Sequence, residues 1–223
     1  MHPVGAPILR RSRAAAILTA IWLVGLIGGT LTLAAYEQTP SSAFVASYGP
    51  DRISQVAQAA LHQKLNKDGP TLIMFAHPFC PCTRASVAEL HKLCSRNPGA
   101  AAHVLFFRPE KSEKLEWGDS ALHEAARKIP GATLGEDRDG RIAASLGVST
   151  SGTVLVLSSA GQVLFVGGIT SGRGHQGDNA GADAVEAALR SQAPFVNPMP
   201  AYGCSLITPD SCARCDAGEE AGT

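Results

Sequence analysis

The sequence predicts an α/β fold with a central mixed sheet and flanking helices, preceded by one transmembrane helix. Three observations support this prediction. Residues 14–35 carry no charged side chain. Short apolar runs of strand length then alternate with segments whose apolar residues recur at helical spacing. The last two apolar runs, 153–157 and 162–166, are separated by a short loop, which predicts an antiparallel hairpin and therefore a mixed sheet.

Composition limits the kinds of function that the chain performs. Its 223 residues suit one globular domain plus extra segments, and 45% of them are hydrophobic, enough for a packed core. The formal net charge is zero, so no basic field favours a nucleic-acid partner. The six cysteines are too few for a disulfide-built scaffold of this size.

The N-terminal segment predicts a membrane anchor. As a helix, residues 14–35 would span about 33 Å, enough to cross a bilayer. Arg10, Arg11 and Arg13 precede them, and the positive-inside rule keeps residues 1–13 in the cytoplasm. A cleaved signal peptide is the alternative, but the apolar run is longer than a usual signal core. We therefore predict a single-pass protein of the inner (cytoplasmic) membrane whose domain faces the periplasm.

A linker at residues 36–50 precedes the predicted domain, residues 51–193. In its first half, amphipathic spacing predicts helices, and short apolar runs predict buried strands. Val87, Leu90 and Cys94 share one face of the helix after the first strand, which makes Cys94 a core thiol. The elements predicted here are helix 51–66, strand 71–76, helix 83–96, strand 102–107 and helix 112–128.

The second half of the domain predicts a short helical turn, the hairpin and a final helix. The turn is placed at residues 142–146. A glycine-rich loop, residues 167–177, follows the hairpin. The final helix is predicted at 178–191, with Asp178 or Asn179 as its N-cap. A tail that contains proline and cysteine follows at residues 194–223.

Cys80 and Cys82 lie between the first predicted strand and the helix that follows it. The unpaired N–H groups and the macrodipole at a helix start stabilise an anion, so a thiolate there has a lowered pKa. The thiolate is the nucleophile in disulfide exchange, and Pro81 suits the first helical turn. We predict that Cys80 attacks and Cys82 resolves. A structural disulfide or a pair of buried thiols is the alternative.

The strand, cysteine pair and helix, followed by a β-hairpin and a final helix, resemble the thioredoxin arrangement. Two features differ: the pair is Cys-x-Cys, and residues 148–153 lack the proline that thioredoxins carry before the hairpin. Residues 77–86, 167–181 and 202–204 are more similar to a bacterial family called RedB-like proteins. This resemblance covers residues 70–206 and implies a thioredoxin-like fold and a redox role.

Three more residues complete the predicted catalytic set. His77 is placed to orient or protonate the cysteine pair, although it is equally an ordinary surface histidine. On the glycine-rich loop, Arg173 would stabilise a thiolate and His175 would shuttle a proton. The alternative for this loop is a set of turns whose polar side chains, Asp178 among them, are solvated. The predicted catalytic residues are Cys80, Cys82, His77, Arg173 and His175.

The predicted function is membrane-anchored thiol–disulfide exchange that needs no cofactor. Its expected partners are a protein or small-thiol disulfide substrate, a redox partner protein and the membrane. A copper-handling protein is the first alternative, with Cys80, Cys82 and His77 or His175 as ligands. A peroxidase, in which Arg173 polarises a peroxide, is the second.

The C-terminal cysteines admit several arrangements. Cys204 is a candidate third redox thiol that folds back onto the domain. Cys212 and Cys215 form a Cys-x-x-Cys pair that would bridge internally, bridge Cys204 or help to bind a metal. In an oxidising compartment the sequence favours a structural disulfide in this tail.

Overall fold

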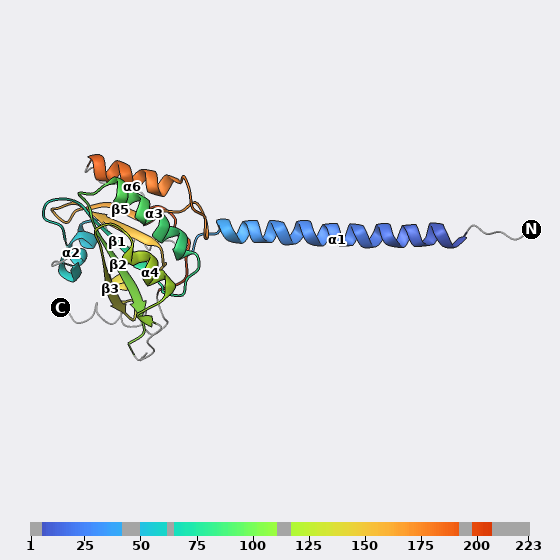
Figure 1. Ribbon diagram of the computed structural model, residues 1–223, viewed down its shortest axis with the longest axis horizontal. Coiled ribbons are helices and arrows are strands. Elements are labelled where there is room, and N and C mark those ends of the chain that lie inside the picture. The colour runs from blue at the N-terminus through green and yellow to red at the C-terminus, as the bar shows by residue number, and fades with distance from the viewer. Residues whose placement is uncertain (1–5, 42–49, 62–64, 111–116, 192–197, 207–223) are drawn as a thin grey trace, which may run out of the picture. The chain divides into compact units, whose positions relative to one another are not determined.

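The computed structural model describes residues 6–41, 50–61, 65–110, 117–191 and 198–206. The chain divides into two units, Met1–Thr39 and Pro40–Thr223. In the first unit, helix α1 (Ala6–Gln38) includes a segment, Arg13–Gln38, that is long and apolar enough to cross a membrane by length and composition (Figure 1). Cys212 and Cys215 lie outside the described residues.

The second unit is built on a five-stranded sheet in the order β3-β2-β1-β4-β5 (Figure 1). β1 pairs parallel with β2, and β2 pairs parallel with β3. β4 pairs antiparallel with both β1 and β5, so the predicted mixed sheet is confirmed. The strands are β1 (Thr71–Ala76), β2 (Ala101–Arg108), β3 (Ala132–Arg138), β4 (Thr153–Leu157) and β5 (Val163–Gly168).

Helices cover both faces of this sheet. On one face, α3, α4 and α6 pack on strand residues such as Leu72 and Met74. On the other face, α2 and α5 pack on the alternate residues, such as Ile73 and Phe75. β1 is central and buried along its whole length, which explains why it reads as a continuous apolar run. The helices are α2 (Pro50–Leu61), α3 (Thr83–Arg96), α4 (Ala121–Arg127), α5 (Arg141–Ser145) and α6 (Ala180–Ser191).

This arrangement is a thioredoxin-like fold, as the sequence predicts. The predicted helix 83–96 and the hairpin of β4 and β5 are confirmed. The short helical turn is α5. Asn179 is the N-cap of α6, because its Oδ1 accepts the backbone N–H of Ala182 at 2.8 Å. Cys94 is 3% exposed and lies in the core, as predicted.

Two predictions of local structure were wrong. The sequence predicts no strand at 132–138, yet β3 forms the sheet edge there. Its side chains are mostly exposed or half-buried and include charged residues, so it lacks the apolar run of a buried strand. The helix predicted at 112–128 is α4, which begins only at Ala121, while residues 111–116 lie outside the described residues. At that start, the backbone N–H of Ser120 donates to Nδ1 of His123 at 3.1 Å.

We expect Leu90→Ala to lower the free energy of unfolding by about 2–5 kcal/mol, because Leu90 is fully buried between α3 and the sheet. Urea denaturation of the detergent-solubilised chain, followed by circular dichroism, measures this loss. His91→Ala, on the exposed face of the same helix, is the matched control and should change stability little. Equal losses in both variants would contradict the packing described here.

Candidate functional site

The cysteine pair lies at the turn that joins the end of β1 to the start of α3. The backbone N–H of Cys80 donates to the carbonyl of His77 at 3.0 Å, which closes the turn after the strand. Cys82 is the N-cap of α3 and already has helical backbone angles, φ −66° and ψ −36°. Thr83 is the first residue of the helix, and its backbone N–H donates to the sulfur of Cys80. Cys80 therefore accepts one of the unpaired N–H groups of the helix start.

The surroundings of Cys80 favour its thiolate. Cys80 is only 3% exposed, and burial alone would raise the pKa of its thiol. Hydrogen bonds from Cys204 and Thr83 to the sulfur outweigh burial and leave the pKa below its ordinary value. Cys80 is therefore the more acidic member of the pair and the better source of a nucleophilic sulfur at neutral pH.

A chain of buried polar groups holds the Thr83 hydroxyl towards Cys80. The backbone N–H of His77 donates to Oγ of Ser151 at 2.7 Å, and that oxygen lies 2.5 Å from Oγ1 of Thr83. Because a backbone N–H only donates, the Ser151 hydroxyl is free to donate to Thr83, and Thr83 donates to the sulfur of Cys80. Thr83 and Ser151 are both fully buried, so water does not compete for these bonds.

Cys82 lies in a different environment. Burial raises the pKa of its thiol, and the negative charge of Cys80 raises it further. The guanidinium of Arg173 opposes both effects through a hydrogen bond and its positive charge. The structure thus brings the predicted Arg173 to the cysteine pair, at Cys82 rather than at Cys80.

Arg173 also holds two other segments of the chain beside the pair. Its Nη1 donates to the carbonyl of Gly203 at 3.1 Å, and its Nη2 donates to Oγ of Ser41 at 2.7 Å. Ser41 in turn donates its hydroxyl to the same carbonyl of Gly203, at 2.5 Å. One guanidinium therefore connects the α3 start, the residue after Pro40 and the C-terminal part of the described chain.

The C-terminal part is residues 198–206, which we call the strap. It brings Cys204 to the site: the backbone N–H of Cys204 donates to the sulfur of Cys80 at 3.3 Å. The Cys204 thiol also hydrogen bonds to that sulfur. Burial, that hydrogen bond and the charges of Cys80 and Cys82 raise the pKa of Cys204 to about 12, although Arg173 opposes them. Cys80, Cys82, Cys94 and Cys204 are all free thiols in the structure.

His77 lies beside the pair within an aromatic cluster. Its ring stacks on Phe107, with centroids 5.6 Å apart, and meets Trp117 edge-on at 5.6 Å. Its Nδ1 accepts the backbone N–H of Phe79 at 3.2 Å, so a neutral ring carries its proton on Nε2. Burial lowers the pKa of His77, which keeps the ring neutral at neutral pH. These contacts describe a packed, neutral histidine next to the site.

The other two candidates of the glycine-rich loop differ from Arg173 in their exposure to solvent. His175 and Asp178 are exposed, whereas Arg173 is half-buried. The loop is attached to α3 by the backbone N–H of Gly177, which donates to the buried carboxylate of Glu89 at 2.8 Å. Among the described residues, no group of three His, Cys, Asp or Glu side chains is arranged to hold a metal ion.

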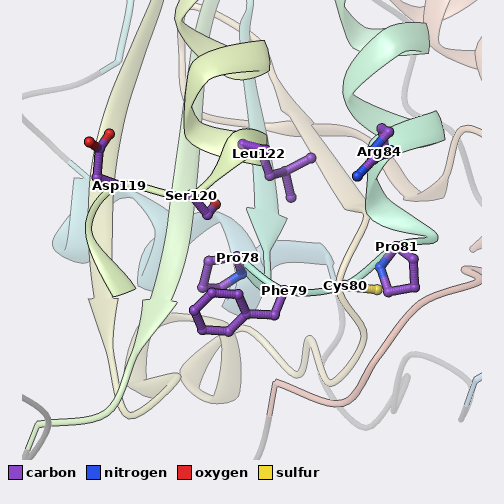
Figure 2. Close-up of a pocket in the computed structure, with 9 residues that line it drawn as sticks. Pro78, Phe79, Cys80, Pro81, Arg84, Asp119, Ser120 and Leu122 are labelled. Atoms are coloured by element: carbon purple, nitrogen blue, oxygen red, sulfur yellow. The ribbon is translucent and has the colours of Figure 1, made fainter. Parts of the chain in front are cut away.

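Cys80 also lines a pocket of about 370 Å³ on the α3 and α4 side of the turn. Figure 2 shows Leu122 and Phe79 between two charged side chains, Arg84 on one side and Asp119 on the other. The pocket thus presents an apolar centre flanked by Arg84 and by Asp119, whose carboxylate pairs with Arg127 at 3.0 Å. The full lining is Pro78, Phe79, Cys80, Pro81, Arg84, Asp119, Ser120, Ala121 and Leu122.

Comparison with known proteins supports the fold and does not assign a family. No family model and no curated protein matches the chain. An uncharacterised conserved protein from Geobacillus kaustophilus is 16% identical with a TM-score of 0.51, and the match covers 64% of this chain and 79% of the other. A hypothetical protein from Sinorhizobium meliloti is 19% identical with a TM-score of 0.51, covering 64% and 82%. These two similarities show a shared fold.

A third solved structure is a secreted disulfide oxidoreductase from Mycobacterium tuberculosis. It is 17% identical with a TM-score of 0.40, and the match covers 58% of this chain and 85% of the other. A similarity of this size has no weight for the function of this chain.

Sequence reasoning missed three polar residues of the site. Ser41, Thr83 and Ser151 were not among its predicted catalytic residues, yet each hydrogen bonds within the site. Thr83 carried a usable signal, because a hydroxyl residue in the first turn of a helix lies within reach of a sulfur just before the helix, here that of Cys80. Ser41 and Ser151 carried none, since their partners lie far away in the sequence.

We expect Thr83→Val to raise the pKa of Cys80 and to slow its alkylation at neutral pH by about tenfold. The substitution keeps the side-chain shape but removes the O–H donor, and a hydrogen bond to a charged group contributes about 1.5–3 kcal/mol. The measurement is the pH profile of iodoacetamide labelling of Cys80, read by mass spectrometry. Thr83→Ser keeps the hydroxyl and should retain the wild-type profile. A profile unchanged in Thr83→Val would contradict the role of this donor.

Proposed function

We propose that the chain is a thiol–disulfide oxidoreductase whose attacking group is the thiolate of Cys80. The observation that carries the proposal is the set of hydrogen bonds that converge on this sulfur at the start of α3. They lower the pKa of Cys80, whereas the pKa of Cys82 is raised. These opposite pKa shifts favour Cys80 as the attacking thiolate and leave Cys82 as the second, protonated thiol.

In the proposed reaction, the Cys80 thiolate attacks one sulfur of a substrate disulfide. That S–S bond breaks, one substrate thiolate leaves, and a mixed disulfide joins Cys80 to the rest of the substrate. A second thiol of the chain then attacks the mixed disulfide and releases the remaining substrate thiolate, which leaves a disulfide within the chain. The sequence predicts that Cys82 performs this second step. An external dithiol of a redox partner protein returns the chain to its reduced form.

The pocket beside Cys80 suits the substrates that this chemistry requires. Its apolar centre and the charge of Arg84 offer contacts to a peptide segment or to a small-thiol disulfide. His77 and His175 remain proposed contributors: His77 through the neutral ring beside the turn, His175 as an exposed proton carrier. No resident cofactor is part of this proposal.

The alternatives predicted from the sequence receive less support. A copper site built from Cys80, Cys82 and His77 is not favoured, since in the described part of the chain these side chains do not form a group of three or more His, Cys, Asp or Glu that could hold a metal ion. A peroxidase would need Arg173 to face a peroxide, but this guanidinium already binds Ser41, Gly203 and Cys82. The relationship to RedB-like proteins stays a proposal based on the sequence motifs.

We expect Cys80→Ser to abolish reduction of the insulin interchain disulfides, because no other described thiol has a lowered pKa. Turnover in the presence of dithiothreitol, measured with detergent-solubilised protein, gives the result. Cys94→Ala removes a thiol from the core, whose pKa burial raises to about 11, and should retain activity. Turnover by Cys80→Ser at the wild-type rate would refute the proposed function.

The proposed location is the inner membrane, with α1 as an uncleaved anchor and the domain in the periplasm. We expect the chain to stay in the membrane fraction after alkaline carbonate washing, since α1 exposes large apolar side chains such as Leu18 and Trp22. Deletion of residues 1–38 should move the protein to the soluble fraction. Release of the intact chain by carbonate would contradict the anchor.

A further inference from the structure

The strap is paired in register with the segment that precedes β4. Thr150 and Ser205 form an antiparallel bridge. On either side of it, the backbone N–H of Ser151 donates to the carbonyl of Cys204 at 2.8 Å, and that of Leu206 donates to the carbonyl of Ser149 at 2.8 Å. The strap thus satisfies the open backbone edge of residues 149–151, and the register fixes where Cys204 lies.

Glycines allow the strap to pack closely against the neighbouring backbone. A Cβ at Gly203 would overlap the carbonyl of Ser151, and a Cβ at Gly140 would overlap the carbonyl of Leu206. Further along the strap, a Cβ at Gly168 would overlap the carbonyl of Pro200. The backbones touch at three places where any larger residue would force them apart, so the position of Cys204 is held from both sides.

The register places Cys204 directly against the sulfur of Cys80. Both its backbone N–H, at 3.3 Å, and its thiol donate to that sulfur. Cys82 is the other neighbour: it is the N-cap of α3, and its thiol also hydrogen bonds to Cys80. The guanidinium of Arg173 also hydrogen bonds to the sulfur of Cys82. Cys204 differs in that it contacts the Cys80 sulfur through both its backbone N–H and its thiol, at a position fixed by the pairing of the strap, and this geometry favours it as the partner of Cys80.

We propose that Cys204 is the resolving thiol of Cys80 and that the oxidised protein carries a Cys80–Cys204 disulfide. This inference rests on the proposed function, because it assigns the second step of that reaction. After Cys80 forms the mixed disulfide, the Cys204 thiol loses its proton and its sulfur attacks the Cys80 sulfur. The bond between Cys80 and the substrate breaks, and the departing substrate thiolate takes up a proton. Two electrons pass from the two cysteines to the substrate disulfide.

The hydrogen bond between Cys204 and Cys80 also determines the order of the two steps. In the reduced protein, burial and the hydrogen bond to the Cys80 thiolate keep Cys204 protonated, with a pKa of about 12. Once Cys80 is part of a mixed disulfide it carries no negative charge, so the hydrogen bond and the repulsion that raise the pKa of Cys204 are both lost. Cys204 then becomes easier to deprotonate at the stage at which its attack is needed.

The test follows both steps with an aromatic disulfide, 5,5′-dithiobis(2-nitrobenzoic acid), which releases a coloured thiolate at each step. The full chain is used in detergent, with Cys212 and Cys215 replaced by Ser so that they do not compete. In this background, the protein that retains Cys204 should give a fast first release and a fast second release of the coloured thiolate. Cys204→Ser should keep the first release, slow the second by more than about tenfold and accumulate the adduct on Cys80. The second release should be slowed far less by Cys82→Ser than by Cys204→Ser.

Two further variants distinguish the effect of the Cys204 thiol from the effect of the position of the strap. Ser205→Ala, next to Cys204 and exposed, should behave as wild type. Gly203→Ala should slow the second release while keeping every thiol, because its Cβ pushes the strap away from Ser151. Peptide mapping of the oxidised protein by mass spectrometry should find the peptides of Cys80 and Cys204 linked.

The outcomes distinguish this inference from the proposed function. A second release at the wild-type rate in Cys204→Ser, with a Cys80–Cys82 link in the peptide map, would overturn the role of Cys204 and leave the proposed function intact. No first release from wild type, with Cys80 unmodified, would refute the proposed function itself.

Discussion

The site depends on the sulfur of Cys80 as a shared hydrogen-bond acceptor. The start of α3 supplies the N–H and O–H of Thr83, and the strap supplies the N–H and thiol of Cys204. Burial opposes the charged form of a thiol that is 3% exposed. Hydrogen bonds to a charged acceptor contribute about 1.5–3 kcal/mol each, so several together outweigh that opposition. Arg173 adds the remaining constraint, since it binds both Cys82 and the strap.

Local pattern predicted most of the fold. Continuous apolar runs predicted β1 and β4, and the shared face of Val87, Leu90 and Cys94 predicted α3, because burial selects those side chains. β3 was missed, since an edge strand that faces solvent has no such selection. The start of α4 was misplaced because it is set by the pairing of Ser120 with His123, which does not follow from periodicity.

The site was predictable only where its chemistry is local. Cys80 and Cys82 were found because a strand and a helix flank them in the sequence. Thr83 and Ser151 are 68 residues apart, and ordinary polar residues at that separation carry no sign that they will meet. The segment 148–153 lacks the proline found at this position in thioredoxins, and here Ser151 and the strap occupy that side of the cysteine pair. The segment that departs from the thioredoxin sequence pattern is therefore the segment that pairs with the strap.

The most direct test of the account is the pKa of each cysteine, read separately by nuclear magnetic resonance from labelled cysteine Cβ carbons over a pH series. This readout does not depend on reagent access, which matters for a thiol as buried as Cys80. The account predicts that Cys80 titrates below the ordinary value for a thiol, while Cys82 and Cys204 titrate above it. If Cys82 or Cys204 titrated first and Cys80 stayed protonated, the converging hydrogen bonds would not control the site.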